Sequence, residues 1–119
     1  MPRAVPPPEI APAEFFTRWL PASVDADAER RALLGDTEAT IAFELEGDGG
    51  GVYYVRIAHG AVRGFAGEPA CADLRVRVDV PSWRALNAGT LSAPRALLQR
   101  RVHLSGNLVL AVKLHLIIG

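Results

Sequence analysis

The chain has 119 residues, half of them apolar, and its 13 basic and 13 acidic side chains cancel. This length fits one domain with its own apolar core, so neither a disulfide framework nor a structural metal is needed. Zero net charge and the lack of interleaved basic and aromatic residues disfavour nucleic-acid binding. The single cysteine, Cys71, has no partner for an internal disulfide or a zinc site, so we expect a structural or incidental role.

The two parts of the chain carry opposite charge. Residues 1–74 have 6 basic and 12 acidic side chains, whereas residues 75–119 have 7 basic and 1 acidic. Such asymmetry can orient a domain on an anionic surface. It also arises when neighbouring elements pair their charges within the fold, and this is the interpretation we favour.

The N-terminal segment predicts an extended arm stiffened by proline. Met1 to Pro12 contains five prolines, and no apolar segment follows a basic start as it would in a secretory signal peptide. The chain also has no apolar run of the roughly 18 residues that a membrane span requires. We therefore expect a cytoplasmic protein.

Two helices are expected after this arm. Residues 12–20 place Phe15, Phe16, Trp19 and Leu20 on one side of a helix, and Pro21 is expected to end it. The aromatic stripe is interpreted as a core-facing side, with a movable lid over a cavity as the alternative. A second helix is predicted over residues 26–34, with Asp25 as its N-cap and Gly35 as its C-cap.

The pattern then changes to that of β-strands. Residues 39–46 and 72–80 alternate apolar and polar side chains, as half-buried strands require. Between them, residues 52–57 and 61–65 form two further predicted strands, entered through the glycine-rich turn at residues 47–51 and the turn His59-Gly60. We expect the glycine-rich segment to be a hairpin turn, since a phosphate-binding loop would lead into a helix.

The last third of the chain predicts short elements and one apolar helix. Helices are expected over residues 81–87 and, capped by Ser92, up to Gln99, followed by a strand over residues 102–105. Between Leu108 and Ile118 only Lys113 and His115 are polar, and the preceding Gly-Asn favours a helix. A helix that is apolar on nearly all sides is expected to be covered on all sides. The expected covers are the sheet on one side and the first helix, or a ligand, on the other.

No catalytic or metal-binding arrangement is visible. The three histidines, His59, His103 and His115, fall in different elements without a carboxylate cluster, and the serines lack the context of an activated nucleophile. Ser82 and Ser92 are interpreted as caps or turn residues. No pair of carboxylates lies in an apolar setting that would separate their pKa values for acid–base catalysis. We therefore expect a protein that is not an enzyme and that needs no cofactor and no metal.

From Ala39 onward the order of motifs resembles the sterol carrier protein 2 family. Residues 43–45, Phe-Glu-Leu, are followed by the glycine-rich turn and by the aromatic strand that begins Val52-Tyr53-Tyr54-Val55. Gly89-Thr90-Leu91 resembles the Gly-x-Leu step of the family. The most specific part is residues 96–114, where Ala-Leu-Leu-Gln, the strand ending in Gly-Asn and the closing helix follow in family order. Arg100 stands where the family commonly has glycine, and Leu98 where it commonly has methionine.

This resemblance implies an α+β fold: a five-stranded, mostly antiparallel sheet with helices on one face around an apolar tunnel. It covers about 80 residues, with Phe15 to Leu20 supplying the usual first helix. Residues 1–119 are expected to form one such domain, residues 1–12 being the arm. The chain lacks the peroxisomal tripeptide of animal members, and 12 arginines against one lysine suit a stand-alone bacterial member.

The expected function is non-catalytic binding or transfer of fatty acid, acyl-CoA, sterol-like or isoprenoid lipids. The expected partners are the lipid and, transiently, a membrane surface or lipid-metabolising enzymes, for a monomer or homodimer. The predicted ligand-binding residues all have apolar side chains and are expected on the helices or on the core-facing side of the sheet. They are Phe15, Phe16, Trp19, Phe43, Val80, Trp83, Leu86, Leu97, Leu98, Leu104, Leu108, Ala111, Val112 and Leu114.

Three alternatives remain. Gln99-Arg100-Arg101 before an alternating strand is similar to bacterial relatives that act as accessory factors of isoprenoid-quinone biosynthesis. A purely structural module could instead bury its apolar C-terminus against a second subunit. A thioesterase-type enzyme is the least favoured class.

Overall fold

The computed structural model describes the backbone of residues 5–118 and the side chains of residues 5–115. The first four residues of the predicted arm and the side chains of residues 116–119 therefore lie outside the described part. Five strands form one sheet in the order β3-β2-β1-β4-β5. Their bounds are β1 Ala39–Glu46, β2 Gly51–Ala58, β3 Ala61–Ala66, β4 Leu74–Asp79 and β5 Val102–Gly106.

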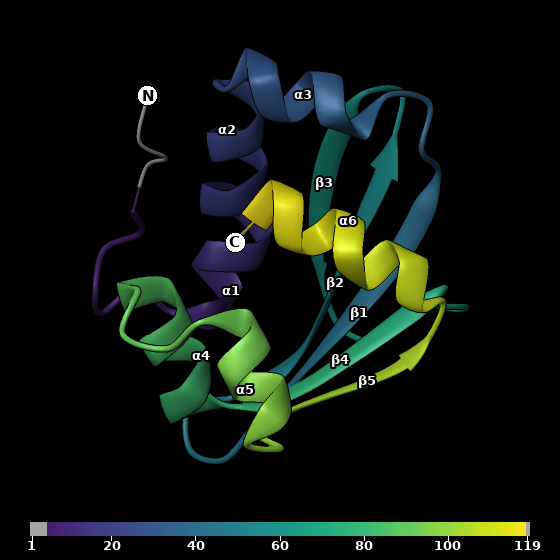
Figure 1. The fold of residues 1–119 in the computed structure, drawn as a ribbon. Coiled ribbons are helices and arrows are strands. Elements are labelled where there is room, and N and C mark those ends of the chain that lie inside the picture. Colours follow the sequence, from purple (N-terminus) through teal and green to yellow (C-terminus); the bar gives the residue numbers. More distant parts are fainter. Residues whose placement is uncertain (1–4, 119) are drawn as a thin grey trace.

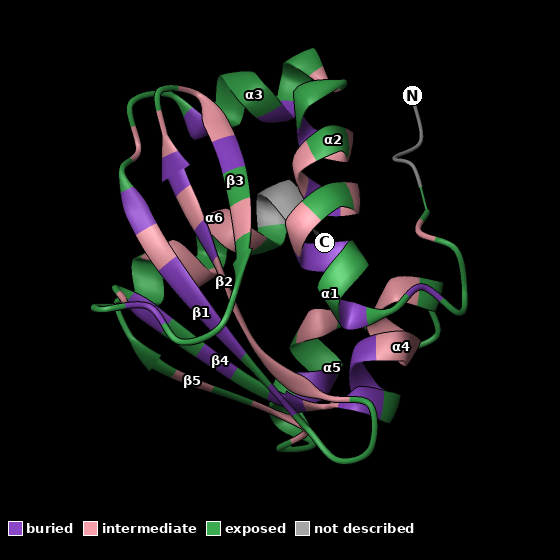
Figure 2. Cartoon of the chain, turned by 180° about the vertical axis from the view of Figure 1, so that it is seen from behind, coloured by how far each residue is buried: buried purple, intermediate pink, exposed green. Residues whose placement is uncertain are grey.

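The helices lie together on one face of this sheet (Figure 1). They are α1 Pro12–Glu14, the π-helix η1 Phe15–Trp19, α2 Leu20–Asp25, α3 Ala28–Leu34, α4 Val80–Ala88, α5 Ala93–Leu98 and α6 Leu108–Ile118. Figure 2 shows the molecule from behind, with the strands in front of α6 and no helix of the described residues over their outer face. Only β1 and β4 pair in parallel, so the mostly antiparallel α+β fold is confirmed.

The core lies between the sheet and the helices because the strands alternate as predicted. In β4, Leu74, Val76 and Val78 are buried, whereas Arg75 and Arg77 are exposed on the outer face. These arginines form ion pairs with Glu68 and, at 3.8 Å, with Glu46. Ion pairs between the acidic first part and the basic second part of the chain thus form between neighbouring segments of the fold.

The first helical segment is longer than predicted, because Pro21 does not end it. η1 widens the helix to i→i+5 hydrogen bonds, and the Leu20 N–H donates to the carbonyl of Phe15. A proline inside a regular α-helix clashes with the carbonyl four residues before it. Pro21 instead stands in the first turn of α2, directly after the π-helix, and the helix continues through it to Asp25.

The helix caps correct two further predictions and confirm a third. Helix α3 begins after Asp27, not Asp25, since the Asp27 carboxylate accepts hydrogen bonds from the N–H groups of Glu29 and Arg30. Helix α4 is capped by Asp79 rather than by Ser82, and β4 consequently ends at Asp79. Ser92 caps α5 as predicted, with its Oγ accepting from the N–H of Arg95 at 3.3 Å.

Two turns contain residues in the left-handed region. His59 and Gly60 have φ values of 54° and 69°, the geometry of a two-residue hairpin turn that matches strand twist. Arg100 has φ 58°, so it takes the conformation that favours glycine, at the position where the family commonly has glycine.

The C-terminal helix α6 is not covered on all sides, which corrects the sequence-based expectation. It packs on α3, β4 and β5 through half-buried Leu110, Ala111 and Leu114. Leu108, Val109 and Val112 are 58%, 75% and 64% exposed. Asn107 caps the helix, accepting from the N–H of Val109 at 3.0 Å. One side of α6 therefore faces outward.

Candidate apolar binding site

The predicted ligand-binding residues fall into three groups of increasing exposure. The buried group consists of Phe15, Phe16, Phe43, Val80 and Trp83. The half-buried group consists of Trp19, Leu86, Leu104, Ala111 and Leu114. The exposed group consists of Leu97, Leu98, Leu108 and Val112. The structure thus separates the predicted residues by depth, from the core to the surface.

The buried group forms an aromatic cluster. Phe16 lies 4.6 Å from Phe43, 5.3 Å from Tyr53 and 6.1 Å from Trp83, measured between ring centroids. Phe15 stacks on Trp19 at 5.5 Å and meets Trp83 edge-on at 5.3 Å. These rings contact one another, which agrees with the core-facing interpretation of the aromatic stripe; their contact with a ligand stays a prediction.

Most of the half-buried group packs against the buried core. Leu104 on the edge strand β5, with Ala111 and Leu114 on α6, packs against the core without being enclosed by it. Val102 and Leu110 share this position and were missed by sequence reasoning, although both are apolar residues of the same two elements. Together these side chains form an apolar wall that is partly open to solvent.

The exposed group comes from α5 and from the start of α6. Leu97 is 44% exposed and Leu98 85%, and Val109 on α6 joins them although it was not predicted. Strand β5 connects α5 to α6, and both helices lie on the same face of the sheet (Figure 1). We call Leu97, Leu98, Leu108, Val109 and Val112 the apolar rim.

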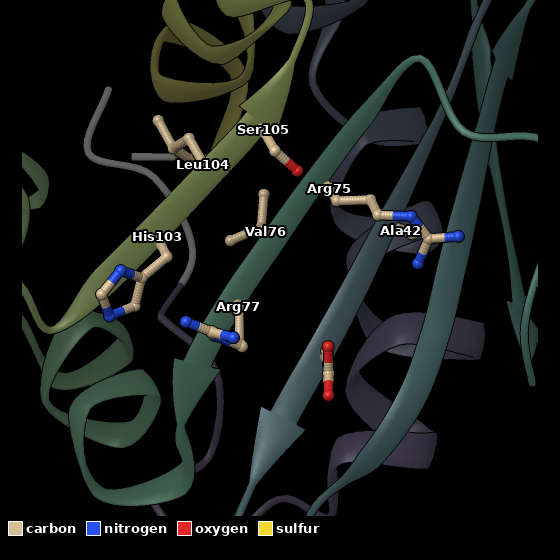
Figure 3. Close-up of a pocket in the computed structure, with 8 residues that line it drawn as sticks. Ala42, Arg75, Val76, Arg77, His103, Leu104 and Ser105 are labelled. Carbon is tan, nitrogen blue, oxygen red and sulfur yellow. The ribbon is translucent and has the colours of Figure 1, made fainter.

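A separate groove of about 300 Å³ lies on the outer face of the sheet (Figure 3). Arg75, Arg77, His103 and Ser105 border it, and of the predicted site residues it includes Leu104. Charged side chains of β1 and β4 also line it, and it lies on the face opposite the helices. It is therefore separate from the apolar side chains of α5 and α6.

Two polar contacts hold the helices that surround the candidate site. The Ser82 hydroxyl donates to Asp79 Oδ1 at 2.6 Å and accepts from Arg101 Nε at 2.8 Å, which joins α4 to the start of β5. Arg84 donates to the carbonyls of Pro8 and Ile10 at 3.0 and 3.1 Å, binding the described part of the arm to α4. The spacing of Asp79 and Ser82 was a visible capping signal, whereas Arg84 acts over too long a separation to be recognised.

The Asp79 contacts predict a loss of stability in acid. The hydrogen bond from the Ser82 hydroxyl, with lesser help from the Ser82 N–H and the charge of Arg101, lowers the pKa of Asp79 from its usual 3.8 despite opposing desolvation. Because the folded pKa is depressed, this contribution is present above the unfolded pKa and is lost as pH falls through the folded value. Asn retains capping ability, so Asp79→Asn removes mainly the charge.

We expect Asp79→Asn to unfold at lower urea concentration than the parent at about pH 7, and this difference to shrink as the pH is lowered below about 4. Urea unfolding across that range measures it. Asp48→Asn, in the exposed turn between β1 and β2, is the charge-matched control and should change little. A difference that stays constant with pH would contradict the assignment.

Within the described residues, no group of three or more His, Cys, Asp or Glu side chains is placed to hold a metal ion. No helix in the same part of the chain is long and apolar enough to cross a membrane. The chain is thus a small α+β domain. Helices cover one face of its mixed sheet, and half-buried apolar side chains lie on the edge strand β5 and on α6.

The SCP-2 sterol transfer family matches residues 16–118, so the chain belongs to this family. It is thus a lipid-binding domain in its general class. No curated protein matches the chain by sequence.

Solved structures share the fold at low identity. The solution structure of palmitated SCP2L2 from Aedes aegypti has a TM-score of 0.71 and 24% identity, over 89% of this chain and 94% of that one. Sterol carrier protein domain 2 of Helicoverpa armigera has a TM-score of 0.71 and 19% identity, over 93% and 88%. The inverting sec-alkylsulfatase Pisa1 from Pseudomonas sp. has a TM-score of 0.68 and 19% identity, over 91% of this chain but 16% of the enzyme. At these identities the likeness shows the fold alone.

Proposed function

We propose that this chain is a non-catalytic carrier that binds the acyl or isoprenoid chain of a lipid between α6, β5 and the aromatic cluster. The observation that carries the proposal is the half-buried apolar wall of Leu104, Ala111 and Leu114, which packs against the core and shares α6 with the exposed residues Leu108, Val109 and Val112 of the apolar rim. Family membership supports it, as does the palmitated state of the Aedes aegypti relative.

The energetics suit a tolerant carrier. Burying an acyl chain of about 16 carbons contributes roughly 12 kcal/mol, and association costs of about 4–15 kcal/mol offset much of it. Affinity then depends on chain length more than on the head group. We therefore expect micromolar binding that weakens by about fourfold for each methylene removed, at about 0.8 kcal/mol per group.

Competitive displacement of a fluorescent fatty acid by a series of shorter acids measures this dependence. In Leu104→Trp the larger side chain would occupy the space proposed for several methylenes of the ligand. We therefore expect this variant to bind about tenfold or more weakly. Ala32→Trp on the exposed face of α3 is the matched control and should bind as the parent does. Equal affinity across the series, together with no lipid in native mass spectra of the purified protein, would contradict the proposal.

The quinone-biosynthesis role is a narrower form of the same proposal, with a polyprenyl chain in place of the acyl chain. Polyprenyl compounds in the same displacement assay compare the two ligand classes directly. The preference for one of them decides between a general lipid carrier and a polyprenyl-holding factor.

A further inference from the structure

The apolar rim lies in the part of the chain with the strongest charge bias. From Val80 to the C-terminus the sequence has five basic side chains, Arg84, Arg95, Arg100, Arg101 and Lys113, and no acidic one. Most exposed leucines on protein surfaces stand alone and need no explanation. Here five exposed apolar residues, all on α5 and α6, lie within this basic part of the sequence, and exposed apolar patches mark interaction surfaces.

The basic residues divide into two kinds. Three of them form hydrogen bonds within the fold: Arg84 with Pro8, Arg101 with Ser82, and Lys113, which donates to Thr37 Oγ1 at 2.6 Å. Arg95 and Arg100 are exposed, and neither forms an ion pair with any residue that the structure describes. These two guanidinium groups flank Leu97 and Leu98 in sequence.

The tip of α5 is therefore an apolar pair between two free cations. Leu98 is 85% exposed, and the left-handed conformation of Arg100 turns the chain directly after it. The second part of the rim begins at Leu108, after β5, whose five residues span about 17 Å as an extended strand. Both lie on the helical side of the sheet (Figure 1).

We propose that the apolar rim docks on an anionic lipid surface, with Leu97, Leu98 and the exposed side of α6 in the outer acyl region and Arg95 and Arg100 at the phosphates. Guanidinium groups bind phosphate oxygens in bidentate geometry. A two-fold pair of copies joined through this face would bring the same cations together, which disfavours a second copy as the occupant. Because the rim adjoins the wall of Leu104, Ala111 and Leu114, docking would open the proposed site toward the membrane; this last step rests on the proposed function.

The experiment is co-sedimentation of the whole chain with vesicles of phosphatidylcholine mixed with phosphatidylglycerol, compared with phosphatidylcholine alone. We expect binding to the anionic vesicles that falls steeply with added salt. Removing both cations with Arg95→Gln and Arg100→Asn should weaken it by about 25-fold, about fivefold for each arginine near an anionic surface. Asn tolerates the left-handed conformation at position 100.

Leu98→Asp should weaken binding by about tenfold or more, since it removes an inserted apolar side chain. The controls are Leu33→Asp and the pair Arg31→Gln and Arg63→Gln, which make the same changes at exposed positions on α3 and β3. Circular dichroism melting verifies that each variant folds. Fluorescent fatty acid binding without vesicles should be unchanged in Arg95→Gln/Arg100→Asn, which separates loss of docking from loss of the ligand site.

Three results would overturn the proposal. They are no sedimentation with anionic vesicles, equal sedimentation with both vesicle types regardless of salt, and equal losses in the control variants. A dimer by light scattering that Leu98→Asp converts to monomer would also overturn it, because the rim would then be covered by a second copy.

Discussion

Replacing Phe16 with alanine is expected to lower the free energy of unfolding by about 3–5 kcal/mol. The Phe16 side chain is 1% exposed and packs on rings from β1, β2 and α4, namely Phe43, Tyr53 and Trp83. These neighbours are held by the sheet and by the capped start of α4, so they have little freedom to close the cavity that alanine leaves. The lost transfer energy and the cavity therefore add.

Urea unfolding followed by far-UV circular dichroism measures this effect. Phe65→Ala is the matched control, because Phe65 is 41% exposed and stacks on Tyr54 at 4.9 Å on the outer face of the sheet. That control is expected to cost about 1 kcal/mol. Similar losses in the two variants would contradict the placement of Phe16 at the centre of the core.

Gly64→Ala is expected to destabilise the fold by about 3 kcal/mol, through overpacking rather than a cavity. An added Cβ at Gly64 would lie 1.7 Å from the carbonyl oxygen of Phe16 and 2.9 Å from the Cα of Thr17. Both are backbone atoms, so no side-chain rotation relieves the clash. η1 has to move away from β3, which pulls Phe16 and its neighbours out of the core.

Gly60→Ala separates this clash from the general cost of replacing glycine. Gly60 has φ 69° with no atom within 4 Å of the added Cβ, so only the conformational cost of about 1 kcal/mol applies. The double variant Phe16→Ala/Gly64→Ala should lose roughly the sum of both effects, since truncating the Phe16 side chain leaves its carbonyl in place. Relief of the Gly64→Ala loss in that double variant would contradict the close backbone approach.

Much of the fold was predictable because strand patterns are local. The alternation in residues 39–46 and 72–80 defines which side chains face the core, and the His59-Gly60 turn defines the hairpin. The order of these motifs also indicated the family, which the match over residues 16–118 confirms. Boundaries were less accurate, because an aspartate at position 25 or 27 could equally cap a helix, and only the structure shows that Asp25 ends α2 and Asp27 caps α3.

The candidate site was predictable in kind but not in arrangement. Sequence reasoning treated residues from Phe15 to Leu114 as one apolar set, since hydropathy alone does not rank them by depth. The structure separates a packed aromatic cluster from a half-buried wall and an exposed rim. Their roles in binding a ligand remain predictions.

The sequence by itself determined the strands, the apolar character of the C-terminal helix and the opposite charge of the two parts of the chain. Each of these depends on side-chain periodicity or composition within a few neighbouring residues. Only the tertiary structure decided that the first helical segment continues through Pro21 and that one side of α6 faces outward. It also decided that the backbone of Phe16 lies so close to Gly64 that no side chain fits there. These features depend on contacts between segments far apart in the chain, where the packing of one backbone against another decides what is covered.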